Sequence, residues 1–394
     1  MAVLLSVQLA AASDWLNWFG SGGIADVGSA LVVAADADGN PAGAWTDRFS
    51  GDLSGSQLRL SLLSHDWGAV SLVEVVASTA GNFEEYMHAD LRPILSAPGE
   101  GEWIDLTVPA GIWTGTAAAD WSTVNGLVVR VTSHAGNNAV VAFADMLFMA
   151  RRPTQGVVTV AFDDARSDVY EHAFPELQQR GLTATVYAIP ELIGQDGFMT
   201  QQQLYELHRA GWEIGAHGEH PLIWMSDEEL TRHFRFASQW LSASGFGDRL
   251  GYAYPNGLVN ERVIERAADW FVTGRTIDAH TNFLGHASRY RLGAVSVYPQ
   301  IAQETLEEMI AGASANGEWL IVVFHLFSDR PSESTQFEPA RFAALLDYLQ
   351  DTSVPVLTAR EAWNRNLQVA VCGGSGARQQ LTPYGAGESE VDCP

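Results

Sequence analysis

Short stretches in which apolar and polar residues alternate fill the chain from about residue 25 to residue 150. Five such stretches lie at residues 57–64, 69–77, 102–108, 126–132 and 139–150. Gly, Asn and Asp residues separate them at hairpin-like spacing. A period of two is typical of a strand with one buried face, and turn residues between such runs favour antiparallel pairing. We therefore expect an all-β, jelly-roll-like sandwich over residues 25–152, after an N-terminal segment over residues 1–24.

The pattern changes after a linker-like stretch at residues 151–156. Apolar strand-like runs now alternate with helical patterns, and a capping-box pair, Ser226 and Glu229, marks the start of one helix. The expected strands lie at residues 157–162, 183–189, 212–216, 251–254, 271–273, 291–297, 319–324 and 354–357. The expected helices lie at residues 169–180, 201–210, 227–244, 261–270, 303–315 and 339–350. This alternation predicts a distorted (β/α) barrel over residues 153–365, followed by a C-terminal tail over residues 366–394.

Composition and charge narrow the classes of function. Apolar residues make up 47% of the chain and charged residues 18%, which is typical of a globular protein. The net charge of −25 disfavours nucleic acid and anionic membranes as partners. All 22 basic residues are Arg, so chemistry that needs a lysine, such as a phosphate-loop lysine or a Schiff base, is excluded. No apolar stretch approaches the 18 or so residues of a membrane span.

The two ends of the chain bear on where the protein works. Cys372 and Cys393 both lie in the last part of the chain, where a disulfide would indicate an oxidising compartment. Two unpaired thiols are the alternative. Residues 1–13 are apolar but lack a positive flank, so they do not form a clear signal peptide. We expect a secreted, cell-surface or virion-associated protein.

Candidate catalytic side chains stand at the ends of the expected barrel strands. Asp163 and Asp164 follow the first strand, His217 and His220 follow the third, and His325 ends a late strand. Active sites of such barrels form at the carboxyl ends of the strands. Adjacent carboxylates at an apolar strand end are unfavourable unless they are paired or bind a cation. One carboxylate and two imidazoles form a common ligand set for a catalytic divalent metal, and the set suits Zn, Co, Ni or Mn.

Four motifs in this order resemble the polysaccharide deacetylases of carbohydrate esterase family 4. They are Phe-Asp-Asp at residues 162–164, His-x-x-His-Pro at 217–221, Tyr-Ala-Tyr-Pro-x-Gly at 252–257 and Phe-His at 324–325. The resemblance covers residues 157–363. It implies one divalent metal ion, zinc in the first place, bound by Asp164, His217 and His220. It also implies that Asp163 is the catalytic base, that His325 is the catalytic acid, and that a backbone N–H near Asn256 holds the oxyanion.

Three features depart from the pattern of that family. The two histidines are usually four residues apart, whereas His217 and His220 are three apart with Gly218 and Glu219 between them. Either the loop tightens and both histidines bind the metal, or Glu219 or water replaces one of them. Ala165 stands where Gly usually follows the aspartate pair. Ala253 replaces an Arg that often orients the base, and either Arg275 or Arg291 is a candidate to supply that charge.

Several other residues are candidates for contact with sugar. Trp224 follows the His-Pro motif in a loop, and we expect it, with Tyr254, Asn256 and Arg166, to bind substrate. The expected sandwich contains Trp45, Trp67, Trp103, Trp113 and Trp121, which are too many to be all buried. One or two of these tryptophans would serve a carbohydrate-binding module as a glycan platform, although the sequence does not select among them.

The combined pattern predicts a metal-dependent hydrolase that removes acetyl groups from a polysaccharide. An N-acetyl sugar polymer is favoured and O-acetyl groups are an alternative. A second hypothesis is a catalytically weak or inactive glycan-binding or structural protein, for example a virion tail component. A third is a metal-dependent hydrolase of other acyl or amide substrates on the same barrel.

Overall fold

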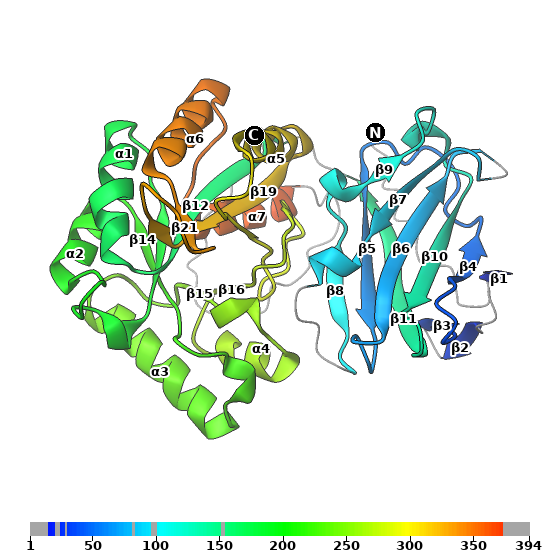
Figure 1. The fold of residues 1–394 in the computed structure, drawn as a ribbon, viewed down its shortest axis with the longest axis horizontal. Coiled ribbons are helices and arrows are strands. Elements are labelled where there is room, and N and C mark those ends of the chain that lie inside the picture. The colour runs from blue at the N-terminus through cyan, green and yellow to red at the C-terminus, as the bar shows by residue number, and fades with distance from the viewer. Residues whose placement is uncertain are drawn as a thin grey trace.

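The computed structural model describes residues 15–19, 24–27, 30–80, 83–95, 101–150 and 154–372, which form a β-sandwich beside an α/β barrel (Figure 1). One sheet of the sandwich has the order β1 (Leu16–Phe19), β4 (Ala42–Thr46), β10 (Gly126–Ser133), β6 (Val70–Ser78), β7 (Tyr86–Asp90) and β9 (Thr114–Gly115). The other has the order β2 (Ile24–Val27), β3 (Ala30–Ala35), β11 (Ala139–Ala150), β5 (Ser56–Leu63) and β8 (Ile104–Thr107). Neighbouring strands are antiparallel in both sheets, so the expected sandwich is confirmed.

The barrel sheet is parallel except at one edge. Its order is β16 (Thr273–Arg275), β15 (Gly251–Ala253), β14 (Glu213–Ala216), β13 (Thr185–Ala188), β12 (Val157–Asp164), β19 (Glu318–Phe324) and β17 (Asn282–Phe283), with β17 antiparallel. The segment around residues 292–296 joins β16, at one end of this order, to β19, next to the other end. Leu292 bridges to Arg275 of β16, and β18 (Val295–Ser296) pairs with β19. The sheet thereby curls into the expected distorted barrel.

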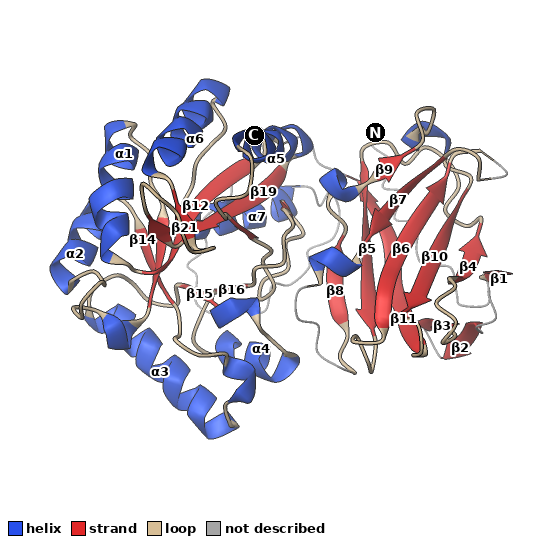
Figure 2. Ribbon diagram, viewed as in Figure 1, coloured by secondary structure: helices blue, strands red, loops and turns tan. Residues whose placement is uncertain are grey.

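Most helices cover the outside of the barrel, whereas the last one packs with its interior layer (Figure 2). The helices are α1 (Phe174–Gln179), α2 (Gln201–Arg209), α3 (Asp227–Ala243), α4 (Glu261–Ala268), α5 (Gln303–Asn316), α6 (Pro339–Thr352) and α7 (Ala359–Cys372). A π-helical turn, Val169–Ala173, precedes α1. The capping box expected at Ser226 and Glu229 is present at the start of α3. Within the described residues no helix is both long and apolar enough to cross a bilayer.

Alternation along the strands divides the barrel core into two layers. In β12, Val158, Val160 and Phe162 pack outward against the helices, whereas Val157 and Ala161 pack inside the barrel. Ala362 and Trp363 of α7 belong to the interior layer. Helix α7 therefore crosses the boundary that we expected at residue 365. It does so because its apolar side chains pack with the interior of the barrel.

Three further expectations concern the end of the barrel, the start of the sandwich and the two cysteines. The strand expected at residues 354–357 is wrong, because only an isolated bridge joins Val356 to Val158. Pro355 offers no N–H, and β13 occupies that edge of β12 from Ala161 onward. At the other end, Trp15 is 6% exposed in the sandwich core, so the sandwich begins before residue 25. The expected pairing of Cys372 with Cys393 lies outside the residues and side chains that the structure describes.

A buried carboxylate joins the two units where β8, the sandwich strand nearest the barrel in Figure 1, faces it. Glu318 of β19 is 2% exposed. Its Oε1 accepts hydrogen bonds from Gln57 Nε2 at 3.2 Å and from Ala110 N at 3.1 Å, both in the sandwich. Its Oε2 accepts from Thr281 Oγ1 at 2.8 Å. The barrel and the sandwich therefore share a hydrogen-bonded interface.

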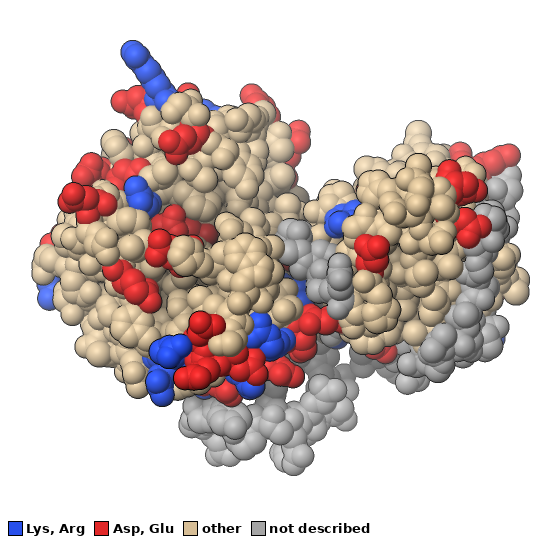
Figure 3. All heavy atoms as spheres, turned by 60° about the horizontal axis from the view of Figure 1, so that its bottom comes forward, with Lys and Arg blue, Asp and Glu red and all other residues tan. Residues whose placement is uncertain are grey.

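Charge is unevenly distributed over the surface. In the view of Figure 3, acidic side chains are spread over the barrel and basic ones gather with them at its lower edge, whereas the visible face of the sandwich carries few charges. At the start of α3, Asp227 forms ion pairs with Arg262 at 3.1 Å and with Arg266 at 3.3 Å. Exposed pairs of this kind contribute little to stability, about 0–1 kcal/mol each.

Candidate active site

Strand parity and register bring Asp163 and His325 to the same rim of the barrel. Phe162 and Phe324 are register partners and point outward, so the next residue of each chain segment points inward. Asp163 is 3% exposed, and its Oδ2 lies 3.8 Å from His325 Nε2. The expected base and the expected acid are therefore close enough to act on one substrate group.

Arg275 supplies a positive charge to this pair. It is 1% exposed at the end of β16 and donates from Nη2 to Oδ1 of Asp163. Its guanidinium carbon lies 4.9 Å from the centre of the Tyr187 ring, and Nη1 donates to Thr276 O at 3.1 Å. Of the two arginines that the sequence offered, Arg275 forms the ion pair. Strand β16 begins two residues later than expected, which puts Arg275 at its end.

The electrostatic surroundings favour the ionised form of Asp163. Burial by itself raises the pKa of this carboxyl group, but the charge of Arg275, together with the imidazoles of His217 and His325, holds the pKa below its usual value. Asp163 is therefore a carboxylate that can accept a proton at neutral pH.

Asp164 and His217 form a second pair beside Asp163. Oδ1 of Asp164 lies 3.5 Å from Nε2 of His217. Nδ1 of His217 lies 2.7 Å from Ala253 O, so this nitrogen carries the proton and donates to the carbonyl. A histidine whose Nδ1 is held in this way presents its Nε2 to a ligand, as metal-ligating histidines generally do. Asp164 has a φ of +67° and Ala165 a φ of +56°, so the backbone is strained directly after the aspartate pair.

The third expected metal ligand is not brought to this pair. His220 is exposed on the turn after β14, and no group of three His, Cys, Asp or Glu side chains within the described ranges is placed to hold a metal. The shortened turn is packed tightly: a Cβ on Gly218 would lie 2.8 Å from the Tyr252 hydroxyl oxygen and 3.2 Å from His233 Nε2. Asp164 and His217 thus fit a divalent ion by type and geometry. His220 would need to turn inward to join them.

The four residues expected to bind substrate lie in different environments. Trp224 is 75% exposed on the loop after His220, and Asn256 is exposed with a φ of +56°. The guanidinium carbon of Arg166 lies 4.3 Å from the centre of the Phe198 ring, which holds Arg166 against the loop after β13. Tyr254 is 1% exposed and belongs to the outer core. Its ring is therefore enclosed beneath the rim and is not open to a substrate.

Two supporting residues had not been identified from the sequence. Tyr187 fills the barrel interior beneath Arg275, and a Cβ on Gly215 would lie 2.7 Å from its ring. His233 on α3 lies with its Nε2 2.7 Å from the Tyr252 hydroxyl oxygen, next to the shortened turn. Alternation of side chains along β13 could have identified Tyr187, because it directs this side chain toward the barrel interior. No local signal marks His233, because its partner is on another element.

Part of the chain resembles a known family of proteins. Residues 150–274 match the family model described as polysaccharide deacetylase. This part of the chain is therefore similar in sequence to polysaccharide deacetylases.

Relatives cover parts of the chain. The polysaccharide deacetylase-like protein YxkH of Bacillus subtilis is 33% identical over 72 residues, which are 18% of this chain and 26% of that protein. The poly-beta-1,6-N-acetyl-D-glucosamine N-deacetylase of Staphylococcus aureus is 24% identical over 120 residues, 26% of this chain and 41% of that enzyme. The chain thus spans less than half the length of these relatives. The structure of deacetylase PplD of Streptococcus pyogenes with acetate is similar with a TM-score of 0.37 and 24% identity, over 40% of this chain and 72% of that chain.

Proposed function

We propose that the protein is a metal-dependent deacetylase of a polysaccharide, with an N-acetylated sugar polymer as the favoured substrate. The observation that carries the proposal is the convergence of Asp163, Asp164, His217 and His325 on one rim of a barrel whose sequence matches the deacetylase family model. The match favours an enzyme over the alternative of an inactive glycan-binding protein.

The protonation chemistry rests on Asp163 and His325. In this mechanism Asp163 accepts a proton from the attacking water, because Arg275 keeps its carboxyl group ionised. His325 then donates a proton to the departing amine or alcohol, since its Nε2 lies 3.8 Å from Asp163 on the same rim. Arg275 acts through Asp163 and is a positioning residue.

Asp164 and His217 would hold a divalent ion, and His220 is the candidate third ligand. Such an ion supplies Lewis-acid polarisation of the acetyl carbonyl and lowers the pKa of water. The same carboxylate and imidazole donors can bind Zn, Co, Ni or Mn. The hydrogen bond from His217 Nδ1 to Ala253 O keeps Nε2 aimed at Asp164, which prepares the pair for a cation.

Substrate contacts are proposed for the exposed residues of the rim. The broad face of Trp224 is free to stack on a pyranose ring, because the residue is 75% exposed beside the histidine turn. The turn that holds Asn256 offers the backbone N–H of Asn256 for the oxyanion, because the N–H groups of Gly257 and Leu258 already donate to Tyr254 O and Pro255 O. Arg166 lies on the loop after β12, where we propose that it binds a hydroxyl or carbonyl group of the substrate.

The nature of the polymer is supported by one relative. The Staphylococcus aureus enzyme acts, by its name, on poly-beta-1,6-N-acetyl-D-glucosamine, which is an N-acetylated polymer. We extend this chemistry to the present chain as part of the proposal. Since such polymers lie outside cells, we also propose a secreted, cell-surface or virion-associated location.

Metal content and acetate release test the proposal together. Purified protein is assayed by elemental analysis and for acetate released from N-acetylchitopentaose, peptidoglycan glycan strands and acetylxylan, before and after chelation. We expect one divalent ion per chain and acetate release that chelation abolishes. Asp163→Asn should keep the metal and lose turnover by about 1,000-fold. His217→Ala should lose the metal, and His134→Ala, at an exposed sandwich position, is the control.

The same assay decides the role of His220. If His220→Ala lowers the metal content, the side chain turns inward in the loaded protein and completes the ligand set. Unchanged stoichiometry would instead assign the metal to Asp164, His217 and water. No acetate release from any of the acetylated polymers by metal-loaded protein would overturn the proposed function.

A further inference from the structure

A recess of about 350 Å³ lies between the sandwich and the barrel, away from the strand ends that form the candidate active site. Residues of both units line it: Arg59 and Trp103 come from the sandwich, and Glu261, Arg289, Tyr290 and Arg291 come from the barrel. This volume is within the range of pockets that bind small molecules. The recess therefore exists only where the two units are docked together.

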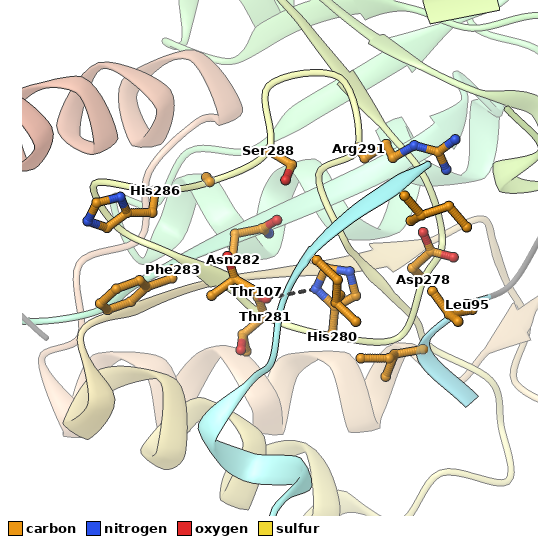
Figure 4. Close-up of a pocket in the computed structure, with 14 residues that line it drawn as sticks. Leu95, Thr107, Asp278, His280, Thr281, Asn282, Phe283, His286, Ser288 and Arg291 are labelled. Atoms are coloured by element: carbon orange, nitrogen blue, oxygen red, sulfur yellow. Dashed lines mark hydrogen bonds between the residues drawn. The ribbon is translucent and has the colours of Figure 1, made fainter. Parts of the chain in front are cut away.

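A smaller inner cavity adjoins the recess and shares His286, Ala287, Ser288 and Arg291 with it. Figure 4 shows Arg291 and Asp278 at one end of this inner cavity and Phe283 and His286 at the other. The guanidinium of Arg291 thus stands at the boundary between the inner cavity and the recess. It can serve a ligand in the recess without leaving its place in the barrel.

The recess concentrates positive charge in a protein whose net charge is −25. Three arginines and one glutamate line it. Among the described residues neither Arg289 nor Arg291 forms an ion pair with a carboxylate, and Nη2 of Arg291 is buried without a hydrogen-bond partner there. A buried guanidinium nitrogen without a partner is unfavourable, so a bound anion would satisfy it.

Arg289 and Arg291 lie on a turn that hydrogen bonds hold against β16 and the residue before it. Nε of Arg289 donates to Val272 O at 2.7 Å, and Arg289 O accepts from Gly274 N at 2.9 Å. The hydroxyl of Tyr290 donates to Phe271 O at 3.1 Å. Because the backbone and these side chains are already held in place, little conformational entropy is lost when a ligand binds.

Trp103 gives the recess an aromatic wall. It is 42% exposed, whereas Trp67 is buried and Trp113 packs edge-on against Trp121 with ring centres 4.8 Å apart. A flat, accessible indole beside guanidinium groups suits a ligand that has both an apolar face and a negative charge. A pyranose ring with a carboxylate has both properties, since Arg binds carboxylates in bidentate geometry and Trp stacks on the apolar face.

We propose that this interdomain recess binds a carboxylate-bearing sugar unit, with Arg289 and Arg291 holding the carboxylate and Trp103 stacking on the ring. The site goes beyond the proposed deacetylase activity and does not depend on it. It would let the sandwich and the barrel anchor an acidic glycan jointly while the strand-end site remains free.

Calorimetric titration of the full chain tests this site with trigalacturonic acid, with maltotriose as the neutral control and inorganic phosphate as the ion-only control. We expect binding of the acidic trimer that weakens as salt is raised from 50 to 300 mM, and at least tenfold weaker binding of maltotriose. Arg289→Gln with Arg291→Gln should weaken binding of the acidic trimer by at least tenfold. Trp103→Ala should weaken it by several-fold.

Matched variants separate this site from the active site and from misfolding. Arg232→Gln, at an exposed position of α3, should bind like the parent protein. Asp163→Asn should also retain binding, which distinguishes failure of this site from failure of the proposed function. Should the double Gln variant fail to fold, Arg291→Lys keeps the charge but loses the bidentate fork, and should still weaken binding. Equal binding of maltotriose, binding of phosphate unaffected by Trp103→Ala, or full binding by the folded variants would each overturn the proposal.

Discussion

Arg275 at the end of β16 donates a hydrogen bond to Asp163 at the end of β12, across 112 positions of sequence. Both side chains are almost fully buried, at 1% and 3% exposure. The pair occupies the interior of the barrel, where an uncompensated charge is costly. Asp163 therefore depends on Arg275 for its ionised state and for its orientation toward the rim.

Replacement of Arg275 should damage both turnover and stability. Arg275→Gln leaves a buried carboxylate without its cation, and we expect a loss of about 3 kcal/mol in the free energy of unfolding. Turnover should fall by about 100-fold with KM little changed, because Arg275 acts through Asp163. Arg275→Lys should be intermediate, since the ammonium keeps the charge but not the fork or the stacking on Tyr187. Chemical denaturation and acetate release measure the two effects, with Arg232→Gln as the control.

The shortened histidine turn should not tolerate a side chain at Gly218. A Cβ there lies 2.8 Å from the buried Tyr252 hydroxyl oxygen, so Gly218→Ser should lose about 1–3 kcal/mol of stability by overpacking. Tyr252→Phe removes that oxygen, and the double variant should recover part of the loss. Thermal unfolding of the three variants measures this. Equal stability of Gly218→Ser and the parent protein would contradict the packing described here.

Replacement of Ala165 by Gly should relieve backbone strain next to the aspartate pair. Ala165 and Ala188 are both fully buried, but only Ala165 has a positive φ, at +56°. Ala188→Gly should cost about 1 kcal/mol through chain entropy and the lost methyl group. Ala165→Gly should be less costly by about 1–2 kcal/mol, because the left-handed conformation is free of steric cost for Gly. Urea denaturation of both variants gives this difference, and equal losses would show that the strain is absent.

His233 should make the protein lose stability in acid. Burial, and then the charge of His217, lowers the pKa of His233 to about 4. In the unfolded chain a histidine has a pKa of about 6.5, so below that pH the unfolded state binds more protons. The contribution of His233 is thus complete above pH 6.5 and declines as the pH falls toward 4, by up to about 3 kcal/mol.

Denaturation of metal-free protein between pH 4 and 7.5 measures this contribution. His233→Gln should have a flatter dependence on pH than the parent protein, because its side chain does not titrate. Carboxylates titrate in both proteins and cancel in the comparison. Parallel curves would assign the acid sensitivity to other groups.

Glu318 should hold the sandwich on the barrel. Glu318→Ala leaves Gln57 Nε2, Ala110 N and Thr281 Oγ1 without their acceptor, and we expect a loss of about 2–4 kcal/mol. Scanning calorimetry should show a larger difference between the unfolding temperatures of the sandwich and the barrel. Glu304→Ala, at an exposed position of α5, is the control and should leave the trace unchanged.

Local patterns of sequence predicted the elements well wherever one residue type repeats at a fixed period. The alternating stretches predicted β5, β6, β8, β10 and β11, but not β1 to β4, β7 or β9. The capping pair Ser226 and Glu229 marked the start of α3. The local patterns wrongly predicted a strand at residues 354–357, where β13 occupies the edge of β12. Helix α7 was also missed, because its apolar side chains face the barrel interior and not an outer helix layer.

Some features of the candidate site were also predictable from the sequence, whereas others were not. Asp163, Asp164, His217 and His325 follow from the sequence alone, because each stands at or directly after the end of an expected strand, and the strand ends of a parallel barrel share one rim. Their roles as base, ligands and acid remain predictions. The placement of Tyr254 in the core reversed an expectation, since only its packing against the neighbouring strand shows that the ring is enclosed.

By itself, the sequence determined a sandwich before a barrel and the identity of the charged groups at the strand ends, because both are properties of short segments. Only the tertiary structure decided that Arg275 and not Arg291 meets Asp163, and that His220 stands apart from Asp164 and His217. It also decided that Trp103 lines one recess with Arg289 and Arg291. These relationships join segments far apart in the chain. Sheet curvature and domain docking set the distances between such segments, and no local pattern encodes them.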